Sequence, residues 1–528
     1  MPRSTVIKRL WWATTAVIAL SAMSMPASSA GTTAGLAPVT KQSTVHTQDG
    51  WVQGVVSGGA RQFLGVPYAA PPVNDRRFAP PQPVASWDGV RPATVQAPAC
   101  VQFQPKGVRN EQATSEDCLY LDIYTPPGVQ PKSMLPVLFF VHGGGGTQGS
   151  GVLYGGERFT SLTNAIFVSV NYRLGAFGQL ALPQLDGSGD FAFLDQLAAL
   201  KWVTQNIAEF GGDPGNVTVD GQSAGSMAVC DMLASPQAAG LFQRAVLEST
   251  PCNLGTATLA AAQAQGRQFA AAAGCTDAAT IVSCLRAAWT PDLVAVQQKY
   301  RPGGLAYGTP LLPLVPKDAI QQGKWNKVPV IVGSTRWEYK LQDVDDADMT
   351  PEQYTAAIRD QFGADAAAVL AHYPLANYPA PFYAYAALGT DSGKACPAYS
   401  LAGRLGTQVP TWQEEFDDPT SPTLFGFQPP GIDMSSAHSA ELAYLWNFAL
   451  GERPLTGVQL TLGRQMDRYW GAFARSGRPA APGLTAWPAV TASAHPVLDF
   501  RPSGNTVSST LFATEHQCGF WSGLGTVS

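Results

Sequence analysis

A serine between two glycines is the clearest candidate for chemistry in this chain. The motif GQSAG at residues 221–225 follows an alternating apolar segment with Val217 and Val219, and it precedes a run at 227–234 that suits a helix. Glycines at both ends suit a turn that is too tight for side chains, and such a turn exposes the serine hydroxyl as a nucleophile. A glycine-rich turn without chemistry is the alternative, because G-x-S-x-G also occurs by chance. The strand-turn-helix context predicts that Ser223 is a nucleophile.

The histidines that follow Ser223 are the candidate bases. A serine hydroxyl is a poor nucleophile until a base takes its proton, and an acid must orient that base. After this type of turn, the acid and then the histidine follow in the chain. His438 lies in a loop of small residues, SSAHSA, before an apolar segment at 442–450 that we expect to be helical. The four histidines after the serine are His372, His438, His495 and His516.

The candidate acid is a glutamate that follows a predicted strand. Glu338 comes after the apolar run at 328–332 and the short turn GSTRW. Catalytic groups collect at the carboxyl ends of strands in open α/β sheets, so this position suits the acid. Two alternatives stay open: Glu338 is a solvated carboxylate paired with Arg336 or Lys340, or a nearby aspartate takes the role. Those aspartates form a polar run better suited to solvent: Asp343, Asp345, Asp346 and Asp348.

A run of glycines predicts the group that binds negative charge. Four glycines, residues 143–146, follow His142 directly after the apolar run at 135–141. Backbone N–H groups of such a loop can bind the oxyanion of a tetrahedral intermediate, together with the N–H of the residue after the nucleophile. We assign Gly144, Gly145 and Ala224 as these donors. A phosphate-binding loop needs a lysine and a different glycine spacing, and neither is present.

Strands alternate with helices along the chain, as the positioning of these residues requires. The runs at 135–141 and 165–170 are apolar on both faces, which is typical of central strands covered by helices on both sides. Residues 191–210 repeat apolar side chains at three- and four-residue spacing and predict an amphipathic helix. The pattern predicts an α/β fold with a mostly parallel sheet. Further strands are predicted within 45–66 and at 118–124, 245–247, 328–332 and 497–500.

The first thirty residues are typical of a signal for export. Arg3, Lys8 and Arg9 form a basic head, residues 10–23 form an apolar run, and residues 28–30 are small, as at a cleavage site. The apolar run is shorter than the roughly 20 residues of a membrane span. We therefore expect a signal peptide at 1–30 and a secreted, extracellular protein without stable membrane insertion. No linker-like run divides the remainder, so 31–528 is predicted to be a single domain.

The charge balance bears on the class of partner. The chain has 33 Lys and Arg against 38 Asp and Glu, which gives a net charge of −5 without basic patches. Such a balance predicts no binding to nucleic acid or anionic lipid. A small molecule is the expected ligand, and the sequence makes no prediction of the oligomeric state.

Eight cysteines fit an oxidising destination. Proximity in the sequence suggests two short loops, Cys100/Cys118 and Cys275/Cys284, but many connectivities are possible. Metal binding is the competing interpretation, yet no Cys-x-x-Cys or clustered Cys/His spacing favours it. We predict no metal and no cofactor. The pairing of the remaining cysteines stays open, with a looser suggestion of Cys230/Cys252 and Cys396/Cys518.

With these motifs the chain resembles the type-B carboxylesterase family, which includes cholinesterases and some fungal lipases within the α/β-hydrolase superfamily. The resemblance extends through most of the chain after residue 30, and its blocks keep the family's order. These blocks are GVPYA at 65–69, EDCLYLD at 116–122, NYRLG at 171–175, DQ at 195–196, FGGDP at 210–214, the serine turn, and Ala437-His438 with Glu441. The resemblance implies the α/β-hydrolase fold with large insertions. It also implies the triad Ser223, Glu338 and His438 and the disulfides Cys100–Cys118 and Cys275–Cys284.

Four positions depart from the family's pattern. Gln222 replaces the acidic residue that usually precedes the serine, and Gly146 stands where an aromatic residue is common. Tyr339 and Ser439 occupy positions that often hold glycine. None of the four removes a catalytic atom, so they bear on specificity and pH dependence. The segment 106–115 lacks the tryptophan with which cholinesterases bind a quaternary ammonium, so we discount choline esters.

The predicted function is therefore that of a secreted serine esterase, which hydrolyses carboxylic esters through an acyl-serine intermediate. Within enzymes, the alternatives are a lipase acting on longer acyl chains and an amidase. A non-catalytic adhesion or binding module is the alternative from another class, because some members of the family have lost the serine. All three triad residues are present here, which favours the enzyme. We expect the walls that set substrate preference in the weakly patterned region 341–430.

Overall fold

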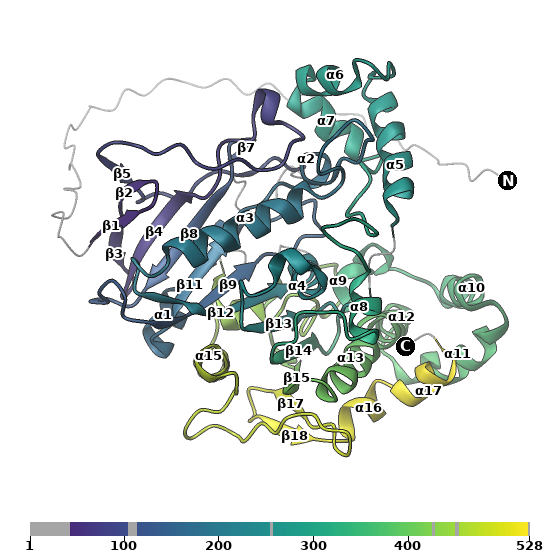
Figure 1. Ribbon diagram of the computed structural model, residues 1–528. Helices are drawn as coiled ribbons and strands as arrows, with labels where there is room; N and C mark the ends of the chain where they lie inside the picture. Colours follow the sequence, from purple (N-terminus) through teal and green to yellow (C-terminus); the bar gives the residue numbers. More distant parts are fainter. Residues whose placement is uncertain (1–42, 104–112, 254–256, 425–427, 449–452, 526–528) are drawn as a thin grey trace, which may run out of the picture. The chain divides into compact units, whose positions relative to one another are not determined.

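An eleven-stranded sheet forms the centre of the structure, in the order β18-β17-β15-β14-β13-β12-β9-β11-β8-β4-β3 (Figure 1). The computed structural model describes residues 43–103, 113–253, 257–424, 428–448 and 453–525. The signal peptide predicted at 1–30 and most of the segment 106–115 lie outside these residues.

Neighbouring strands from β17 through β11 pair in parallel, and antiparallel strands extend the sheet at both ends. The predicted α/β fold with a mostly parallel sheet is therefore confirmed. The strands are β3 (Val55–Ser57), β4 (Ala60–Pro67), β8 (Tyr120–Thr125), β9 (Leu135–Val141), β11 (Ile166–Val170), β12 (Gly212–Gln222), β13 (Arg244–Glu248), β14 (Val330–Thr335), β15 (Thr411–Phe416), β17 (Val497–Phe500) and β18 (Thr506–Ser508).

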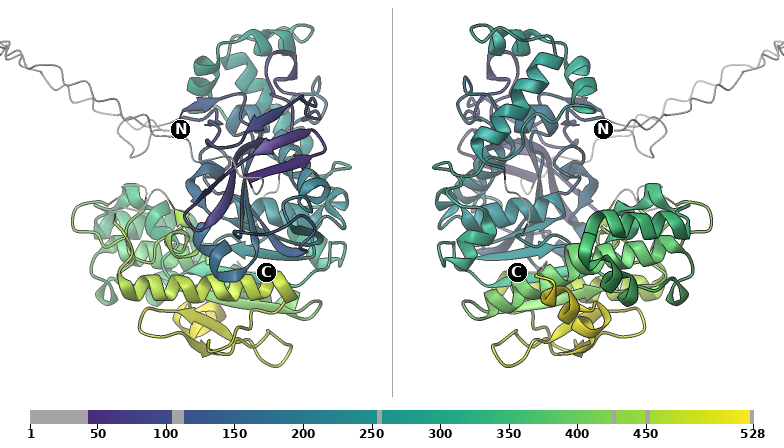
Figure 2. Two further views of the ribbon diagram at one scale, coloured as in Figure 1. Left: turned by 90° about the vertical axis from the view of Figure 1, so that its left-hand side faces the viewer. Right: turned by 90° about the vertical axis from the view of Figure 1, so that its right-hand side faces the viewer.

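Helices cover both faces of the sheet, which explains the continuous apolar runs of its central strands. In β9, Val137 and Phe139 belong to one core, whereas Leu138 and Phe140 belong to another. The first core lies under α3 (Phe191–Asn206) and α4 (Ala224–Ala234), and the second lies under α1 (Glu157–Thr163) and α15 (Gly457–Ser476). Successive side chains of one strand thus enter different cores, so the side chains on both faces of the strand must be apolar. Figure 2 shows α15, the long yellow-green helix, crossing beneath the sheet.

The amphipathic helix predicted at 191–210 is shorter in the structure. α3 begins at Phe191 as predicted but ends at Asn206. A turn follows in which the Gly212 N–H donates to the Ile207 carbonyl, and Gly211 has a φ of 95°. Because that φ lies in the region that favours glycine, Gly211 allows the chain to turn from the end of α3 into β12.

The helix predicted at 442–450 begins at Leu442 as predicted but is much shorter, and residues 449–450 lie outside the described residues. α14 covers only Leu442–Leu445, and the chain is extended at Trp446, with φ −124° and ψ 162°. Asn447–Phe448 then forms β16, which pairs with β10 (Tyr154–Gly155). Trp446 packs against aromatic rings of the second core, with its ring centroid 4.6 Å from that of Phe167. The apolar run therefore forms one short helical turn and then an extended segment in which Trp446 is buried.

The weakly patterned region 341–430 contains a central strand and a group of helices. β15 has the sequence TWQEEF, and its two glutamates obscure the apolar pattern although all six residues are buried. The helices gather to one side of the sheet in the green part of the chain (Figure 2). They are α10 (Pro351–Phe362), α11 (Ala366–His372), α12 (Pro381–Thr390), the π-helical turn η8 (Asp391–Ala395) and α13 (Cys396–Gly406).

All eight cysteines are paired. The structure contains Cys100–Cys118 and Cys275–Cys284, the two pairs that the family resemblance implies. The pairs left open at the sequence level are Cys230–Cys252 and Cys396–Cys518. Within the described ranges, no helix combines the length and the apolar character that crossing a membrane requires.

A buried charge cluster fixes the C-terminal segment to β15. His516 Nδ1 lies 2.5 Å from Asp391 Oδ1, and its Nε2 lies 2.6 Å from Glu415 Oε1. Burial disfavours the imidazolium, but Glu415 and Asp391 outweigh that effect and raise the pKa of His516 to about 9. The cluster explains how Glu415 can lie in a central strand, because its charge is paired there.

This cluster predicts a loss of stability at alkaline pH. A histidine whose folded pKa lies near 9, against an ordinary value near 6.5, stabilises the fold fully below pH 6.5. That contribution, roughly 3 kcal/mol, decreases as the pH rises through 9. We expect His516→Gln to lower the free energy of unfolding by about this amount at pH 6 and by much less at pH 9.5, as measured by urea denaturation. An equal difference at both pH values would contradict the assignment.

Candidate active site

Ser223 lies at the apex of a sharp turn between a strand and a helix. β12 ends at Gln222, α4 begins at Ala224, and Ser223 between them has φ 58° and ψ −120°, which is rare for a residue with a side chain. A Cβ atom on Gly221 would overlap the carbonyl of Gly225, so strand and helix approach too closely for a side chain there. The turn therefore has the geometry that the GQSAG motif predicts, with the serine raised above the end of the sheet.

Three side chains from distant parts of the chain form one hydrogen-bonded chain. Ser223 Oγ lies 2.8 Å from His438 Nε2. On the other side of the ring, His438 Nδ1 is hydrogen-bonded to Glu338 Oε2. With the proton on Nδ1 donated to Glu338, Nε2 has a lone pair directed at the serine hydroxyl. This is the order of nucleophile, base and acid that activates a serine.

Backbone contacts fix the acid and the histidine relative to each other. Glu338 follows β14 and is completely buried, and its Oε1 accepts a 2.8 Å hydrogen bond from the Thr335 N–H. The Trp337 N–H donates to the Ser436 carbonyl over 2.9 Å, which joins the loop of the acid to the loop of the histidine. Such backbone donors leave no trace in the sequence, since any residue type supplies them.

The alternative partners of Glu338 are engaged elsewhere. Arg336 Nη1 lies 2.7 Å from Glu515 Oε2, and Lys340 Nζ lies 3.3 Å from Asp433 Oδ2. Neither cation forms an ion pair with Glu338 among the residues that the structure describes. Glu338 is thus not the solvated loop carboxylate that the sequence left open.

The other histidines that follow the serine contact other groups. His372 Nδ1 lies 2.7 Å from Gln517 Oε1, and His495 Nε2 lies 2.5 Å from Gln413 Oε1. His516 belongs to the charge cluster on β15. Of the four, His438 is the one that is hydrogen-bonded to both Ser223 and a carboxylate.

The glycine loop begins directly against the serine. A Cβ atom on Gly143 would lie 3.0 Å from Ser223 Cβ. The next residues, Gly144 and Gly145, have φ values of 105° and 64°, and in the described part of the chain neither N–H donates to a protein acceptor. Ala224 is the first residue of α4, where an N–H has no acceptor within the helix. The three predicted donors are therefore available to an anion.

His142 supports this loop as a neutral residue. The Tyr172 hydroxyl donates to the His142 carbonyl over 2.7 Å, and the two rings stack with centroids 4.4 Å apart. Burial lowers the pKa of His142 to about 4, so its ring is uncharged at neutral pH. The loop thus presents backbone dipoles without a cationic side chain.

Replacement of Gly144 should displace the glycine loop and thereby slow the ester hydrolysis that the sequence predicts. A Cβ atom there would overlap the Gln148 carbonyl at a φ of 105°, so the loop must move. We expect Gly144→Ala to lower kcat for ester hydrolysis by roughly 10²–10³-fold, the usual effect of losing one oxyanion donor. Gly128→Ala is the matched control, because Gly128 also has a positive φ of 79° but no atom within 4 Å of its Cβ position. Equal activity of the two variants would contradict the role of the loop.

Two of the four departures from the family's pattern contact each other. Gln222 Nε2 donates to Ser439 Oγ over 2.9 Å. Nearby, Ser249 Oγ donates to Glu441 Oε1 over 3.3 Å. Burial, followed by the charge of Glu338, raises the pKa of Glu441 to about 8, so this carboxyl is protonated at neutral pH. The glutamine itself is uncharged, so position 222 adds no negative charge beside the serine.

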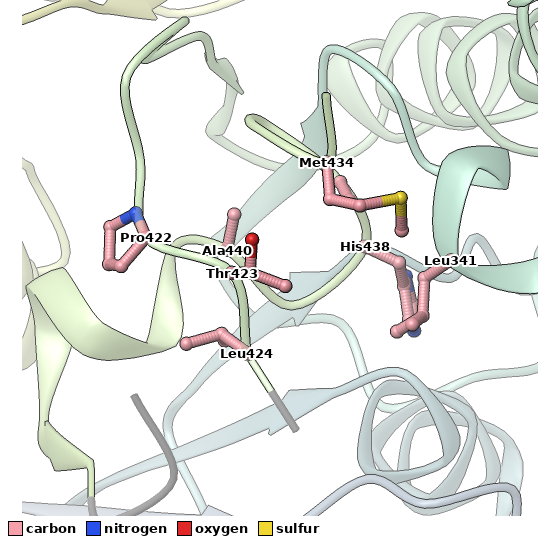
Figure 3. Close-up of a pocket in the computed structure, with 8 residues that line it drawn as sticks. Leu341, Pro422, Thr423, Leu424, Met434, His438 and Ala440 are labelled. Atoms are coloured by element: carbon pink, nitrogen blue, oxygen red, sulfur yellow. The ribbon is translucent and has the colours of Figure 1, made fainter. Parts of the chain in front are cut away.

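A narrow, mostly apolar pocket borders His438 (Figure 3). In this view Pro422, Thr423 and Leu424 lie on one side, and Leu341, Met434 and His438 lie on the other. The pocket has about 10 Å³ open to the centres of water molecules, which is room for about one water. Residues 341 and 422–424 fall within the region predicted to hold the walls of the substrate site, whereas Met434, Ala437 and Ala440 lie beyond it.

The described residues contain no group of three or more His, Cys, Asp or Glu side chains arranged to hold a metal ion. Nucleophilic catalysis by a serine with a histidine, a carboxylate and backbone N–H donors requires no metal ion.

The sequence is similar to known proteins over most of its length. A sequence model described as the carboxylesterase family matches residues 41–521. The chain is 31% identical over 473 residues to Cocaine esterase of Homo sapiens, covering 82% of both chains. It is 31% identical over 504 residues to Liver carboxylesterase 1 of Mus musculus, covering 84% of this chain and 87% of the relative. Liver carboxylesterase of Sus scrofa is 32% identical over 476 residues, covering 81% and 82%.

Proposed function

Because this chain belongs to the carboxylesterase family, we propose that it hydrolyses carboxylic esters with Ser223, His438 and Glu338 as its catalytic triad. The observation that carries the assignment is the hydrogen-bonded chain from Ser223 Oγ through the imidazole to the buried carboxylate. Membership of the family supports a carboxylic ester hydrolase, and the geometry supports the residues that perform the reaction.

The proposed reaction begins when Ser223 Oγ attacks the ester carbonyl carbon while its proton passes to His438 Nε2. The carbonyl oxygen becomes an oxyanion, which accepts hydrogen bonds from the N–H groups of Gly144, Gly145 and Ala224. His438 then gives its proton to the departing alkoxide, which leaves as the alcohol. Glu338 keeps the imidazole in the required tautomer and stabilises its protonated form.

The second half of the reaction regenerates the enzyme. Water attacks the acyl-serine carbonyl and transfers its proton to His438, so that a second oxyanion forms in the same glycine loop. Collapse of this intermediate releases the carboxylic acid and returns the proton from His438 to Ser223 Oγ. No cofactor enters either half, because each proton and electron pair has a donor and an acceptor among these groups.

Labelling with an organophosphate tests the proposal. The phosphorus centre accepts the activated serine oxygen, and we expect one equivalent of label per chain, on the peptide that contains Ser223. Mass spectrometry of the digested protein locates the label. Label on another serine, or no label on an active enzyme, would overturn the assignment.

We expect small esters to be better substrates than long-chain ones. The pocket beside His438 has room for about one water, so it offers no space for a long acyl chain. The rate with p-nitrophenyl butyrate should exceed that with p-nitrophenyl palmitate by at least about tenfold. Leu341→Ala enlarges the pocket, so it should reduce the ratio of the butyrate rate to the palmitate rate. A higher rate on the palmitate ester would instead favour the lipase alternative.

Export of the protein is also part of the proposal. Four disulfides support an oxidising destination. N-terminal sequencing of protein recovered from a culture medium is the test, and we expect a start near Gly31. Recovery of the chain only inside the cell, with its first thirty residues retained, would contradict this part.

A further inference from the structure

A side-chain amide without a protein partner lies beside the glycine loop. A Cβ atom on Gly146 would lie 2.6 Å from Gln179 Nε2, so this amide occupies the space next to Gly146. Gln179 is only partly buried, and its amide forms no hydrogen bond with any other residue that the structure describes. Neither polar atom of the amide is completely buried. The amide is therefore free to form a hydrogen bond with a bound molecule.

Gly146 belongs to the loop that holds the predicted oxyanion donors. It directly follows Gly145, and the loop turns tightly because the Gln148 N–H donates to the Gly144 carbonyl over 3.0 Å. The φ of Gly146 is 69°, in the region that favours glycine. A large side chain at this position would cover or displace the Gln179 amide. Glycine at 146 thus leaves a polar group uncovered beside the groups that are proposed to bind the ester carbonyl oxygen.

The short helix α2 (Gly175–Gln179) fixes Gln179 against this loop. At the start of the helix, the Gly175 N–H donates to the Gly146 carbonyl over 2.8 Å. At its end, the Gly304 N–H donates to the Gln179 carbonyl over 3.1 Å. The helix also packs against α3 and against α7 (Thr290–Gln297), as Figure 1 shows. Because the backbone makes the contacts at both ends, replacement of the Gln179 side chain should leave the helix in place.

The chemistry of this amide differs from that of the pocket beside His438. That pocket presents mostly apolar side chains, from residues 341 and 422–440. Gln179 comes from a different part of the chain, and its amide donates through Nε2 and accepts through Oε1. The amide is neutral, so it favours hydrogen-bonding groups and does not select for charge. Gly146, one of the four departures from the family's pattern, thus exposes a polar group beside the glycine loop.

We propose that Gln179 is a specificity-determining residue, whose side-chain amide donates a hydrogen bond to an oxygen atom of the substrate outside the reacting ester group. The favoured substrates are small esters that carry an ether, hydroxyl or carbonyl oxygen close to the ester bond. A wholly apolar ester displaces water from the amide and offers it no acceptor, which costs free energy. This inference rests on the proposed function, because it takes the glycine loop as the place where the ester carbonyl binds.

Pairs of esters with the same shape test the hydrogen bond. p-Nitrophenyl methoxyacetate and p-nitrophenyl butyrate differ at one position of the acyl chain, where an ether oxygen replaces a methylene group. Gln179→Met removes the amide and keeps an unbranched side chain of similar length. We expect this variant to lower the ratio of kcat/KM for the methoxyacetate to kcat/KM for the butyrate by about three- to tenfold, the usual effect of one hydrogen bond. The intrinsic reactivities of the two esters are the same for both enzymes, so they cancel in this comparison. 2-Methoxyethyl acetate and butyl acetate test the alcohol side in the same way.

Gln184→Met is the matched control, because Gln184 is an exposed glutamine whose Nε2 donates to the Ala278 carbonyl over 3.3 Å. Its ratios should equal those of the wild type. A lower ratio in Gln179→Met for either pair of esters supports the inference, and unchanged ratios for both pairs overturn it. An equal loss of kcat/KM on all four esters also overturns it, because such a loss reports the structure of the loop and not a preference for substrate oxygen. Thermal melting verifies that each variant is folded, and Gln179→Leu decides if the methionine variant does not fold.

The failure of this inference is distinguishable from that of the proposed function. A wild type that neither hydrolyses esters nor takes up the organophosphate at Ser223 would refute the function. An active, labelled wild type whose ratios are the same in Gln179→Met would refute only the role of Gln179.

Discussion

Ser223→Ala is expected to abolish ester hydrolysis, with kcat falling by roughly 10⁶-fold. In the proposed reaction the hydroxyl oxygen forms the bond to the acyl group in the first half and is released from it in the second, and no neighbouring side chain can replace it at the apex of the turn. His438, Glu338 and the glycine loop remain in place, so the residual rate reflects binding and oxyanion stabilisation alone. Initial rates with p-nitrophenyl butyrate measure the loss, and the organophosphate should no longer label the variant.

The variant should fold as the wild type does. The unusual backbone at residue 223, with φ 58°, is imposed by β12 and α4, and alanine has the same Cβ as serine. Ser161→Ala is the matched control, since Ser161 is an exposed serine on α1 whose hydroxyl contacts only the Arg158 carbonyl among the described residues. Its activity should equal that of the wild type. Undiminished turnover by a folded Ser223→Ala protein would refute the proposed mechanism.

The sheet was predictable wherever burial on both faces leaves a continuous apolar run. β9 covers the predicted residues 135–141, and β17 covers 497–500. β15 was not predicted, because Glu414 and Glu415 interrupt its apolar pattern although both side chains are buried. Glu415 is compensated by His516, about a hundred residues further along the chain. A strand stabilised by distant charges gives no local signal, so its prediction requires the tertiary structure.

The sequence predicted the two local motifs of the candidate site, and it predicted the order in which nucleophile, acid and base follow along the chain. The GQSAG turn and the glycine run each contain their own geometry, because the glycines that permit it are in the motif. The order of such residues along the chain narrowed the choice of base and acid without settling it, and the structure joins His438 and Glu338 to the serine by hydrogen bonds. The family resemblance drawn from these blocks is confirmed by the match over residues 41–521.

Contacts between departures from the family's pattern were not predictable. The hydrogen bond from Gln222 to Ser439 joins residues 217 positions apart, and neither residue type alone indicates the other. The same holds for Tyr339, whose ring packs against Gly389 of α12 and Gly393 of η8. Gln222, Tyr339 and Ser439 are each isolated in the sequence, and their contacts appear only when the fold brings the partners together.

Glu338→Gln should lower kcat by about 10⁴-fold, which corresponds to about 5.4 kcal/mol of transition-state stabilisation. The buried carboxylate accepts from two donors, the Thr335 N–H at Oε1 and His438 Nδ1 at Oε2. A glutamine side chain has one oxygen and one NH₂ group, so it cannot accept both bonds. With its oxygen bonded to Thr335, its NH₂ would face Nδ1 and favour the tautomer with the proton on Nε2. That tautomer cannot accept the serine proton, and the charge that stabilises the imidazolium is lost as well.

Asp343→Asn is the matched control for this variant. Asp343 lies five residues further on and burial raises its pKa to about 7, but its carboxylate has no contact with His438 within the described residues. We expect kcat of Asp343→Asn to remain within about threefold of the wild type, whereas Glu338→Gln loses activity with little change in KM, because substrate contacts are unaltered. A near-normal kcat for a folded Glu338→Gln protein, with a large loss in Asp343→Asn, would move the role of the acid to the aspartate. Comparing kcat of Glu338→Gln with kcat of Asp343→Asn thus identifies which of the two carboxylates orients His438.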